Sequence, residues 1–384
     1  MAIAARSGAS RESGPGGTVT HVHVVVPAGI DDPTRVSGGN RYDREVCDDL
    51  RRAGWQVTEI AVEGSWPRPD PRAPAALARA LDGLADGALV LADGLVASAA
   101  RAVLVPRSRR LRLVVLVHMV FGGDAVGAGD EAAVLGAARA VVTTSHWTRR
   151  RLLDRYDLPA AAVHVAHPGT RPAPVSPPSA GGGRLLCVGT LAPVKGQDLL
   201  VAALGGLAGL PWRCTLVGSG DRCPRFTAAL DRRISATGLG DRVRVTGVRT
   251  GAALRRRFQE ADLLVVPSRA ETYGMVVTEA LAAGLPVLAT RVGGLPESLG
   301  RSAAGLPGLL VPPDDHAALR AALAAWLTDR DLRDRLRDAA LLRRQDLPGW
   351  PATGTRIREV LSAVALNRPR PRSVSTGETD GGRA

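Results

Sequence analysis

Residues 184–204 read RLLCVGTLAPVKGQDLLVAAL. The apolar run RLLCV predicts a buried strand, QDLLVAAL predicts a helix, and a loop from Gly189 to Gly196 joins the two. A glycine-rich turn that leads into a helix presents free backbone N–H groups and the positive end of the helix dipole. Lys195 adds a compact positive charge there, which suits a phosphate oxygen. This stretch therefore predicts an α/β fold with a phosphate site at the end of a strand.

Lys195 is the only lysine in the chain, since the other 49 of the 50 basic residues are arginine. A lysine beside a turn is usually an ordinary surface residue, and that interpretation is the alternative here. The composition favours a functional role, because a chain that uses arginine at every other basic position keeps one lysine where a strand, a glycine turn and a helix meet.

A second motif, PSRAETYGMVVTEALAAGLPVLATRVGGLPE, spans residues 267–297 and contains Glu271 and Glu279. If a helix begins near Gly274, Glu279 lies in its second turn and Glu271 lies in the preceding loop. Carboxylates in such positions suit the vicinal hydroxyls of a ribose or a hexose, and the amides from Gly274 to Val276 can hold an anion. Solvated acidic residues around a helix start are the alternative, but the strand run and glycine pair that follow make the motif more specific.

Short runs rich in β-branched residues alternate with Ala-, Leu- and Arg-rich helical segments along most of the chain. Strands are expected at 20–27, 56–62, 87–92, 111–118, 140–144, 184–189, 215–218, 242–247, 262–267, 285–290 and 308–313. Helices are expected at 39–53, 73–85, 145–156, 315–328, 330–344 and 352–366. This βαβ rhythm calls for parallel sheets covered by helices on both faces.

The rhythm is interrupted at residues 168–183, PGTRPAPVSPPSAGGG, whose Pro and Gly content indicates a linker. We therefore expect an α/β protein with two doubly wound, Rossmann-like domains that face a central cleft, where ligands bind at the carboxyl ends of the strands. The expected order is a disordered tail at 1–17, an N-terminal domain at 18–167, the linker at 168–183, a C-terminal domain at 184–345, a C-terminal helix within 346–366 that packs back toward the N-terminal domain, and a disordered tail at 367–384.

The net charge of +13 is unevenly distributed, with +3 over residues 1–175 and +10 over residues 176–384. A nucleic-acid surface would interleave basic residues with stacking aromatic side chains, and the chain has only three Phe and three Tyr. We therefore expect no nucleic acid partner. A basic half that attracts a small polyanion, such as a nucleoside diphosphate, fits this distribution better.

Cysteine usage and hydropathy favour a cytoplasmic protein. The four cysteines include no CxxC pair and no histidine at metal-ligand spacing, so a reduced protein without a metal site is the simplest interpretation. Residues 1–17 lack the apolar core of a signal peptide, and the longest apolar run, near 113–121, is about half of the ~20 residues that a spanning helix needs. The arginines at 107–112 and 149–151 could touch the inner face of an anionic membrane; solvated faces are the alternative.

The motifs of the second half resemble the donor domain of retaining family-4 glycosyltransferases, which have the GT-B fold. The matching signatures are the G-x5-K-G loop, VGSG at 217–220, V-x-G at 245–247, PS-x-x-E at 267–271, and E-x7-E followed by GLPV and GG-x-PE. The resemblance covers nearly all of 184–330. It continues more weakly in the first half, with SGG at 37–39, VTTSHWTRRRL at 142–152 and HPGT at 167–170. It implies that the first domain is the acceptor side and that the second holds a nucleotide-sugar donor.

The resemblance also implies a role for each candidate residue. Lys195 would bind the donor diphosphate and stabilise charge on the leaving group, Glu279 would bind the ribose hydroxyls and Glu271 would contact the transferred sugar. The implied catalytic residues are His118, Lys195 and Glu271, and the implied donor-binding residues are Gly38, Gly39, Gly189, Thr190, Lys195, Gly274, Met275, Val276 and Glu279.

Three of these candidates come from the first half of the chain. His118 ends the strand expected at 111–118, and similar enzymes have a histidine there that contacts the donor sugar; a core histidine satisfied by the backbone is the alternative. Gly38 and Gly39 would bring the backbone of the opposite domain close to the pyrophosphate and the sugar. His146, by contrast, is expected to belong to the cap of the next helix.

The loop from Gly189 to Gly196, called the lysine loop below, departs from the resembled family at two positions. Many relatives have an arginine after the first glycine or before the lysine, where this chain has Thr190 and Val194. One diphosphate contact is therefore missing, or another residue supplies it, with Arg269 and Arg291 as candidates.

The predicted function is transfer of a hexose-type sugar from a nucleoside-diphosphate sugar to an acceptor hydroxyl, with retention at the anomeric carbon. Neither a metal nor a cofactor is expected, because no DxD motif lies in a loop with neighbouring acidic ligands and Lys195 with helix-start amides can stabilise the leaving group. Two alternatives stay open: a nucleotide-sugar epimerase of GT-B-like fold, and a non-catalytic nucleotide-sugar-binding paralogue, which the absent arginine suggests.

Overall fold

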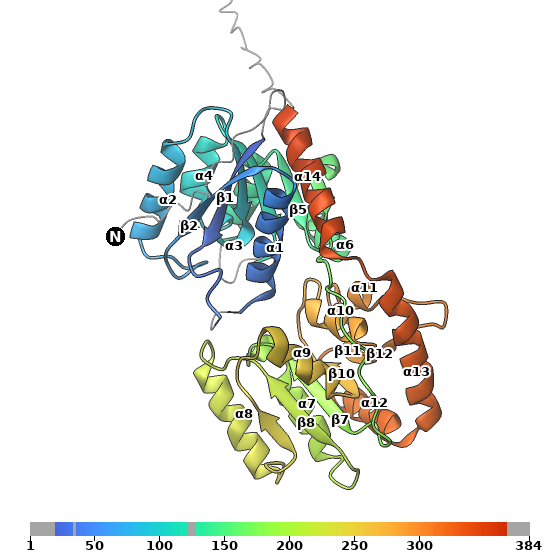
Figure 1. Ribbon diagram of the computed structural model, residues 1–384. Coiled ribbons are helices and arrows are strands. Elements are labelled where there is room, and N and C mark those ends of the chain that lie inside the picture. Colours follow the sequence, from blue (N-terminus) through green and yellow to red (C-terminus); the bar gives the residue numbers. More distant parts are fainter. Residues whose placement is uncertain (1–19, 34–35, 122–126, 367–384) are drawn as a thin grey trace, which may run out of the picture.

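The computed structural model describes residues 20–33, 36–121 and 127–366, and within them two parallel six-stranded sheets form two domains (Figure 1). The sheet of the first domain has the strand order β2-β1-β3-β4-β5-β6, and the sheet of the second has the order β12-β11-β10-β7-β8-β9. This arrangement confirms the expected α/β class with two doubly wound domains. The tails predicted at 1–17 and 367–384 lie outside the described residues.

The first domain follows the alternation expected from its apolar runs. Its elements are β1 (His21–Pro27), α1 (Gly38–Arg52), β2 (Gln56–Val62), α2 (Arg72–Asp82), β3 (Leu89–Asp93), α3 (Gly94–Ala97), α4 (Arg101–Arg107), β4 (Arg112–Val117), α5 (Ala128–Ala137), β5 (Ala140–Thr143), α6 (His146–Arg155), η1 (Ala160–Ala162) and β6 (Val163–Val165). Strands β3, β4 and β5 are buried along nearly their whole length. Continuous apolar runs are typical of parallel strands that are covered by helices on both faces.

The second domain repeats this plan after the Pro-rich linker. Its elements are β7 (Arg184–Val188), η2 (Pro193–Lys195), α7 (Gln197–Gly205), β8 (Arg213–Val217), α8 (Pro224–Ala236), β9 (Val243–Val245), α9 (Gly251–Gln259), β10 (Leu263–Val266), α10 (Met275–Ala282), β11 (Val287–Thr290), α11 (Leu295–Leu299), β12 (Gly308–Val311), α12 (His316–Thr328), α13 (Arg330–Arg343) and η3 (Arg344–Asp346). The central strands β10 and β11 are fully buried. The loops after β7 and β10, which carry the two quoted motifs, lie side by side because these strands are neighbours in the sheet.

The last helix, α14 (Trp350–Leu366), returns to the first domain and packs against α1 (Figure 1). Ile357 of α14 belongs to the same apolar core as Tyr42 of α1. The two helices approach closely at Gly354, where a Cβ would come 2.0 Å from Asp49 Oδ2. The chain therefore crosses between the domains twice, first through the linker and again before α14.

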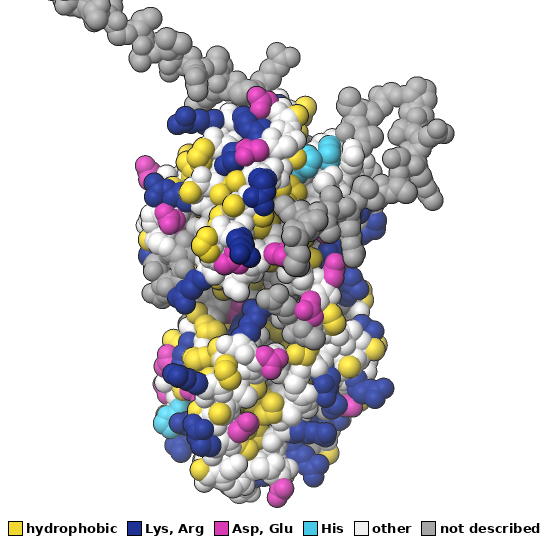
Figure 2. All heavy atoms as spheres, turned by 90° about the vertical axis from the view of Figure 1, so that its left-hand side faces the viewer, with side chains coloured by type: hydrophobic (Ala, Val, Ile, Leu, Met, Phe, Trp, Pro, Cys, Tyr) yellow, Lys and Arg dark blue, Asp and Glu magenta, His cyan; other side chains and the backbone are white. Residues whose placement is uncertain are grey.

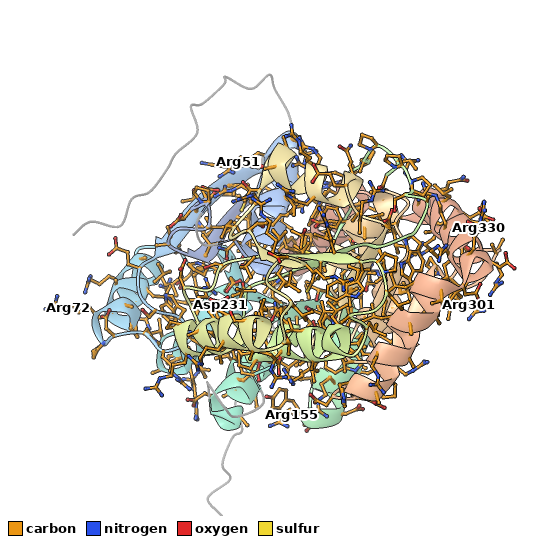
Figure 3. All side chains as sticks on the ribbon, turned by 90° about the horizontal axis from the view of Figure 1, so that it is seen from below. Arg51, Arg72, Arg155, Asp231, Arg301 and Arg330 are labelled. Carbon is orange, nitrogen blue, oxygen red and sulfur yellow. The ribbon has the colours of Figure 1, made fainter. Side chains whose placement is uncertain are left out.

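Basic side chains are spread over the surface. On the face shown in Figure 2, they are interspersed with acidic side chains over both domains. Arg72, Arg301 and Arg330 lie at the edge of the molecule and point outward (Figure 3). In the described part of the chain, no helix combines the length and the apolar character needed to cross a bilayer.

The arginines at 107–112 are partly engaged inside the first domain. Arg107 Nε donates to Asp82 Oδ1 at 2.8 Å. Arg112 Nη1 donates to the carbonyl oxygen of Ala365, in α14, at 2.7 Å. These contacts leave less of the run available to a membrane surface.

Candidate active site

Lys195 lies in the loop after β7, where the chain packs against a neighbouring loop of the same domain. The loop ends at Gly196, whose φ is +68° and where a Cβ would come 2.0 Å from the carbonyl oxygen of Pro267. Glycine is required there for both reasons. Lys195 Nζ donates to Glu271 Oε2, so these two predicted residues form an ion pair although they are 76 positions apart.

Arg269 braces the lysine loop. Its backbone N–H donates to the carbonyl oxygen of Val194 at 2.8 Å. Its guanidinium donates to both carboxylate oxygens of Asp198, at 2.9 and 2.8 Å, and to Asp314 Oδ1 at 2.6 Å. These contacts occupy the guanidinium of Arg269, which argues against its use as the missing diphosphate ligand. Arg291, the other candidate, follows β11 and is exposed.

Gly189 and Thr190, two of the predicted donor-binding residues, directly follow β7. The backbone N–H of Gly189 donates to the carbonyl oxygen of Val217 at 2.8 Å. The carbonyl oxygen of Thr190 accepts from Gln197 Nε2 at 3.0 Å. At Gly218, in the VGSG signature, a Cβ would come 1.9 Å from the carbonyl oxygen of Gly189, so the two turns are in direct backbone contact.

Helix α10 begins at Met275 with no side-chain cap, directly after Gly274, whose φ is +86°. Met275 and Val276 therefore lie in the uncapped first turn, where backbone N–H groups can bind an anion. Glu279 lies in the second turn, which confirms the expected position of this carboxylate. Burial raises the pKa of Glu279, an effect that the charge of Arg41 opposes.

The glycine pair after β11 supports the loop that carries Glu271. At Gly293, whose φ is +55°, a Cβ would come 1.7 Å from the carbonyl oxygen of Glu271. The backbone N–H of Gly294 donates to the same oxygen at 3.0 Å. The GG-x-PE signature therefore serves to hold the Glu271 loop in place.

His118 follows β4 and lies between two buried carboxylates. His118 Nε2 donates to Asp43 Oδ1 at 2.7 Å and is 3.4 Å from Asp93 Oδ2. Burial alone would lower the pKa of His118, but Asp43 and Asp93 raise it to about 9. Burial and the charge of Asp43 raise the pKa of Asp93 to about 8. The imidazole is thus satisfied by side chains and not by the backbone, which was the alternative.

Asp43 and Asp93 were not predicted from the sequence. Asp93 is the last residue of β3, so its place at the carboxyl edge beside the end of β4 was available as a signal. Asp43 lies inside the amphipathic helix α1, where a buried carboxylate cannot be told from a solvated one by spacing alone.

The Gly38–Gly39 turn connects His118 to the second domain. Helix α1 begins there, after Ser37, whose Oγ accepts from the backbone N–H of Asn40 at 3.0 Å. A Cβ on Gly39 would lie 3.1 Å from His118 Cδ2, and a Cβ on Gly38 would lie 3.4 Å from Met275 Sδ. The turn therefore packs between His118 and the start of α10.

The Glu271–Gly274 loop also contacts the first domain directly. Thr272 Oγ1 donates to the carbonyl oxygen of His118 at 2.6 Å, and the carbonyl oxygen of Thr272 accepts from Ser145 Oγ at 2.7 Å. Arg41 of α1 forms an ion pair with Glu279 of α10. The carboxyl edges of the two sheets therefore face each other, with the predicted site residues on both sides.

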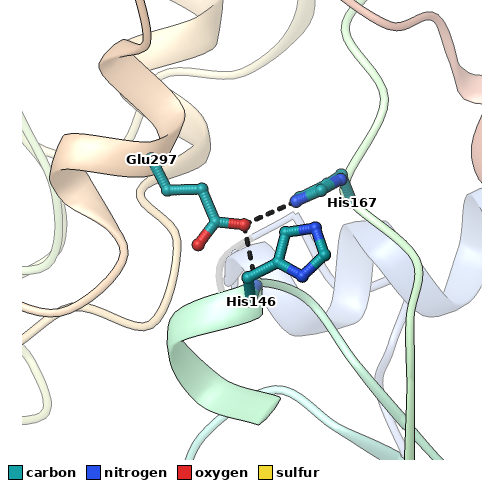
Figure 4. A group of neighbouring side chains, drawn as sticks. All are labelled: His146, His167 and Glu297. Carbon is teal, nitrogen blue, oxygen red and sulfur yellow. Dashed lines mark hydrogen bonds and ion pairs between the residues drawn. The ribbon is translucent and has the colours of Figure 1, made fainter. Parts of the chain in front are cut away.

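A third contact between the domains involves Glu297 of α11 (Figure 4). Its carboxylate accepts from the backbone N–H groups of His146, at 2.7 Å, and Trp147, at 3.0 Å, which begin α6. His167 Nε2 donates to Glu297 Oε1 at 2.6 Å. Ser145 is the N-cap of α6, so His146 lies in the cap region as expected.

A family model described as Glycosyl transferases group 1 matches residues 176–343. The chain is 33% identical over 269 residues to D-inositol 3-phosphate glycosyltransferase of Kineococcus radiotolerans, an alignment that covers 63% of this chain and 61% of that protein. It is 31% identical over 299 residues to D-inositol 3-phosphate glycosyltransferase 1 of Catenulispora acidiphila, covering 70% of this chain and 71% of that protein. The chain thus spans 61% of the length of the first relative.

Solved structures share the fold at low identity. A glycosyltransferase from Rickettsia africae superposes with a TM-score of 0.71 at 18% identity, covering 92% of this chain and 100% of that chain. Anabaena Alr3699/HepE in complex with UDP-glucose superposes with a TM-score of 0.71 at 18% identity, covering 90% of this chain and 100% of that chain. At these identities the likeness concerns the two-domain architecture alone.

Proposed function

Because the chain belongs to the glycosyl transferases group 1 family and has the GT-B fold, we propose that it transfers a hexose-type sugar from a nucleoside-diphosphate sugar to an acceptor hydroxyl, with retention and without a metal. The observation that carries the proposal is the position of Lys195. The only lysine of the chain pairs with Glu271, in the loop that leads into the uncapped first turn of α10.

In this proposal, Lys195 and the α10 amides bind the donor diphosphate. A lysine and helix-start N–H groups place positive charge where the leaving diphosphate gains negative charge, and fixed charges of this kind supply much of the rate enhancement of many enzymes. Glu271 then exchanges its ion pair with Lys195 for hydroxyls of the transferred sugar. UDP-glucose, the ligand in the Anabaena complex, is the first donor to test.

The first domain contributes groups from the opposite side. His118, held in one orientation by Asp43 and Asp93, contacts the donor sugar, and the Gly38–Gly39 turn lets the backbone approach the pyrophosphate. Glu279 binds the ribose hydroxyls after it separates from Arg41.

The proposed reaction uses no protein nucleophile. The acceptor hydroxyl attacks on the face from which the diphosphate departs, and a phosphate oxygen of the leaving group takes the proton. Closure of the domains would exclude water and so limit hydrolysis of the donor. The acceptor side lies in the first domain, and D-inositol 3-phosphate, named for the relatives, is the first acceptor to test.

A non-catalytic nucleotide-sugar-binding protein is the second candidate, because Thr190 and Val194 replace the arginine of many relatives and Arg269 is engaged by Asp198 and Asp314. Such a protein would bind a donor without releasing nucleoside diphosphate. An epimerase would change the donor sugar without an acceptor. Incubation of UDP-glucose with and without acceptor distinguishes all three.

Lys195→Ala tests the proposed function. We expect turnover to fall by about 10²-fold or more, because one electrostatic stabiliser of the leaving group is lost. Arg301→Ala is the matched control, since it removes one outward-pointing positive charge from the same domain (Figure 3). Near wild-type turnover in Lys195→Ala would overturn the assignment.

Peripheral membrane contact is a subsidiary hypothesis. It predicts that the protein sediments with vesicles that contain anionic lipid and not with neutral ones, and that Arg150→Ala or Arg151→Ala, at two exposed arginines, reduces this sedimentation.

A further inference from the structure

Three potential metal ligands from three separate segments meet at the domain interface (Figure 4). His146 begins α6, His167 follows β6, and Glu297 belongs to α11 of the second domain. One ligand atom from each residue lies within 4.8 Å of the other two. We propose that His146, His167 and Glu297 bind a zinc ion that links the two domains.

The donor set is one that zinc prefers. Two imidazole nitrogens and one carboxylate oxygen form a common three-ligand zinc site, which leaves a fourth position for water. Mg²⁺ and Ca²⁺ favour oxygen ligands, so the two histidines select against them. The rings of His146 and His167 have centroids 5.2 Å apart and are inclined by 63°, so their nitrogens can converge without stacking.

The carboxylate of Glu297 is already held in place. Its Oε1 accepts from the backbone N–H of His146 at 2.7 Å, and its Oε2 accepts from that of Trp147 at 3.0 Å. Each bond occupies one lone pair, so a second lone pair on Oε1 is left for a metal. Hydrogen bonds of this kind fix a ligand carboxylate and increase metal affinity. The carboxylate is therefore oriented before any ion binds.

The ion would lie between His167 Nε2 and Glu297 Oε1, which are joined by a hydrogen bond of 2.6 Å in the structure. Zinc takes the place of the shared proton, since it binds the neutral imidazole and the ionised carboxylate. Ligand atoms around a tetrahedral zinc lie about 3.3 Å apart, given bonds of about 2.0–2.1 Å. His146 is exposed, so its ring can rotate to complete the set.

The site ties the first domain to the second, because Glu297 and the histidines belong to different domains. It lies next to the loop that carries Glu271: the rings of His167 and Tyr273 have centroids 5.7 Å apart. A bound ion would hold α11 against the start of α6. It needs no part in sugar transfer, so the inference goes beyond the proposed function and is tested apart from it.

The test is a zinc titration of the 384-residue chain, without a tag, after treatment with a chelator, with competition by a chromophoric chelator as readout. We expect one equivalent of zinc to bind and to raise the melting temperature, since an ion that binds only the folded state stabilises it. Bound Co²⁺ should show the intense visible absorption of a low-coordinate site.

His146→Ala and His167→Ala should each weaken zinc binding by at least about 10-fold. In His146→Ala the helix cap survives, because Glu297 accepts from the backbone N–H of residue 146 and not from its ring. His21→Ala is the matched control: His21 also lies beside another histidine, with its ring centroid 4.2 Å from that of His23. It should bind zinc within about twofold of wild type.

Three results would overturn the proposal: no stoichiometric zinc binding, binding that survives both interface substitutions, or binding lost equally in His21→Ala. Melting temperatures measured with chelator present show whether each variant folds. None of these readouts depends on glycosyl transfer, so a failure here leaves the proposed function untouched.

Discussion

Arg41, in the first turn of α1, forms an ion pair across the domain interface with Glu279 of α10, 238 positions later in the chain. The side chain of Glu279 is only 16% exposed, so this carboxylate depends on Arg41 for its neutralising charge. In the proposed function the same carboxylate binds the ribose. Donor binding and the interdomain ion pair therefore compete for one group.

This competition predicts the effect of Arg41→Met on nucleoside binding. Without the arginine, ribose hydroxyls meet an unoccupied carboxylate, so the affinity for uridine should rise about 5-fold, the equivalent of about 1 kcal/mol for one hydrogen bond. Isothermal titration with uridine measures the effect without a contribution from phosphate. Arg44→Met is the matched control, because Arg44 lies on the same helix and pairs with Asp31 and Glu59. Unchanged or weaker uridine binding in Arg41→Met would contradict the idea.

The environment of His118 predicts a pH dependence of stability. Its pKa is raised from 6.5 to about 9 in the folded protein. The resulting stabilisation is fully present below pH 6.5 and is lost as the pH rises through about 9. The pKa of Asp93 is raised from 3.8 to about 8, so its contribution to stability is also lost as the pH rises, over the range from 3.8 to about 8. The free energy of unfolding should therefore fall between pH 6.5 and 9.

Asp43→Asn tests the cause of this dependence. Removing the Asp43 charge lowers the pKa of both His118 and Asp93, so the decline of stability with pH should become shallower. Urea unfolding at several pH values measures the slope, and NMR titration of the imidazole measures the pKa of His118 directly. His316→Ala, at an exposed histidine of α12, should leave the slope as it is. An unchanged slope in Asp43→Asn would exclude this ion pair as the cause.

Gly196→Ala should destabilise the protein more than its backbone conformation alone requires. A non-glycine residue in the left-handed region costs about 1–2 kcal/mol, and the added Cβ would also come 2.0 Å from the carbonyl oxygen of Pro267. Gly238→Ala isolates the first cost, since Gly238 has a similar φ of +66° and no atom within 4 Å of an added Cβ. Urea unfolding free energies give the comparison, and equal losses would show that the lysine loop moves aside without penalty.

Arg269 should act on turnover through Asp198 and not through direct contact with the diphosphate. Arg269→Ala and Asp198→Ala should lower turnover by similar factors, about 10-fold, because either change releases the lysine loop. The double variant should be no worse than Arg269→Ala, since that substitution already removes the contact with Asp198. If Arg269 bound the donor, Arg269→Ala alone would weaken UDP binding strongly, and calorimetry would detect the difference.

Much of the architecture was predictable from local patterns. The apolar runs of β3, β4, β10 and β11 are nearly or fully buried, and this burial is what a parallel sheet requires of each strand. The loop of Lys195 was recognisable for the same kind of reason, because the strand, the glycines and the following helix are contiguous in the chain. The start of α10 and the position of Glu279 followed from the turn at Gly274.

The contacts that join the two domains were not predictable in this way. Arg41 and Glu279, or Glu297 and the start of α6, come from segments whose spacing in the chain carries no periodic signal. Asp43 and Asp93 approach His118 only because β3 and β4 end, and α1 begins, at one sheet edge.

The alternation of short apolar runs with helical segments was enough to predict two parallel sheets, and the glycine turn at Lys195 was enough to predict one phosphate loop, since burial and turn chemistry act over a few neighbouring residues. The partners of the charged groups were set by how the domains pack, because a buried charge takes whichever opposite charge the folded chain brings to it. Lys195 stood out in the sequence, but its partner Glu271 was identified by the fold.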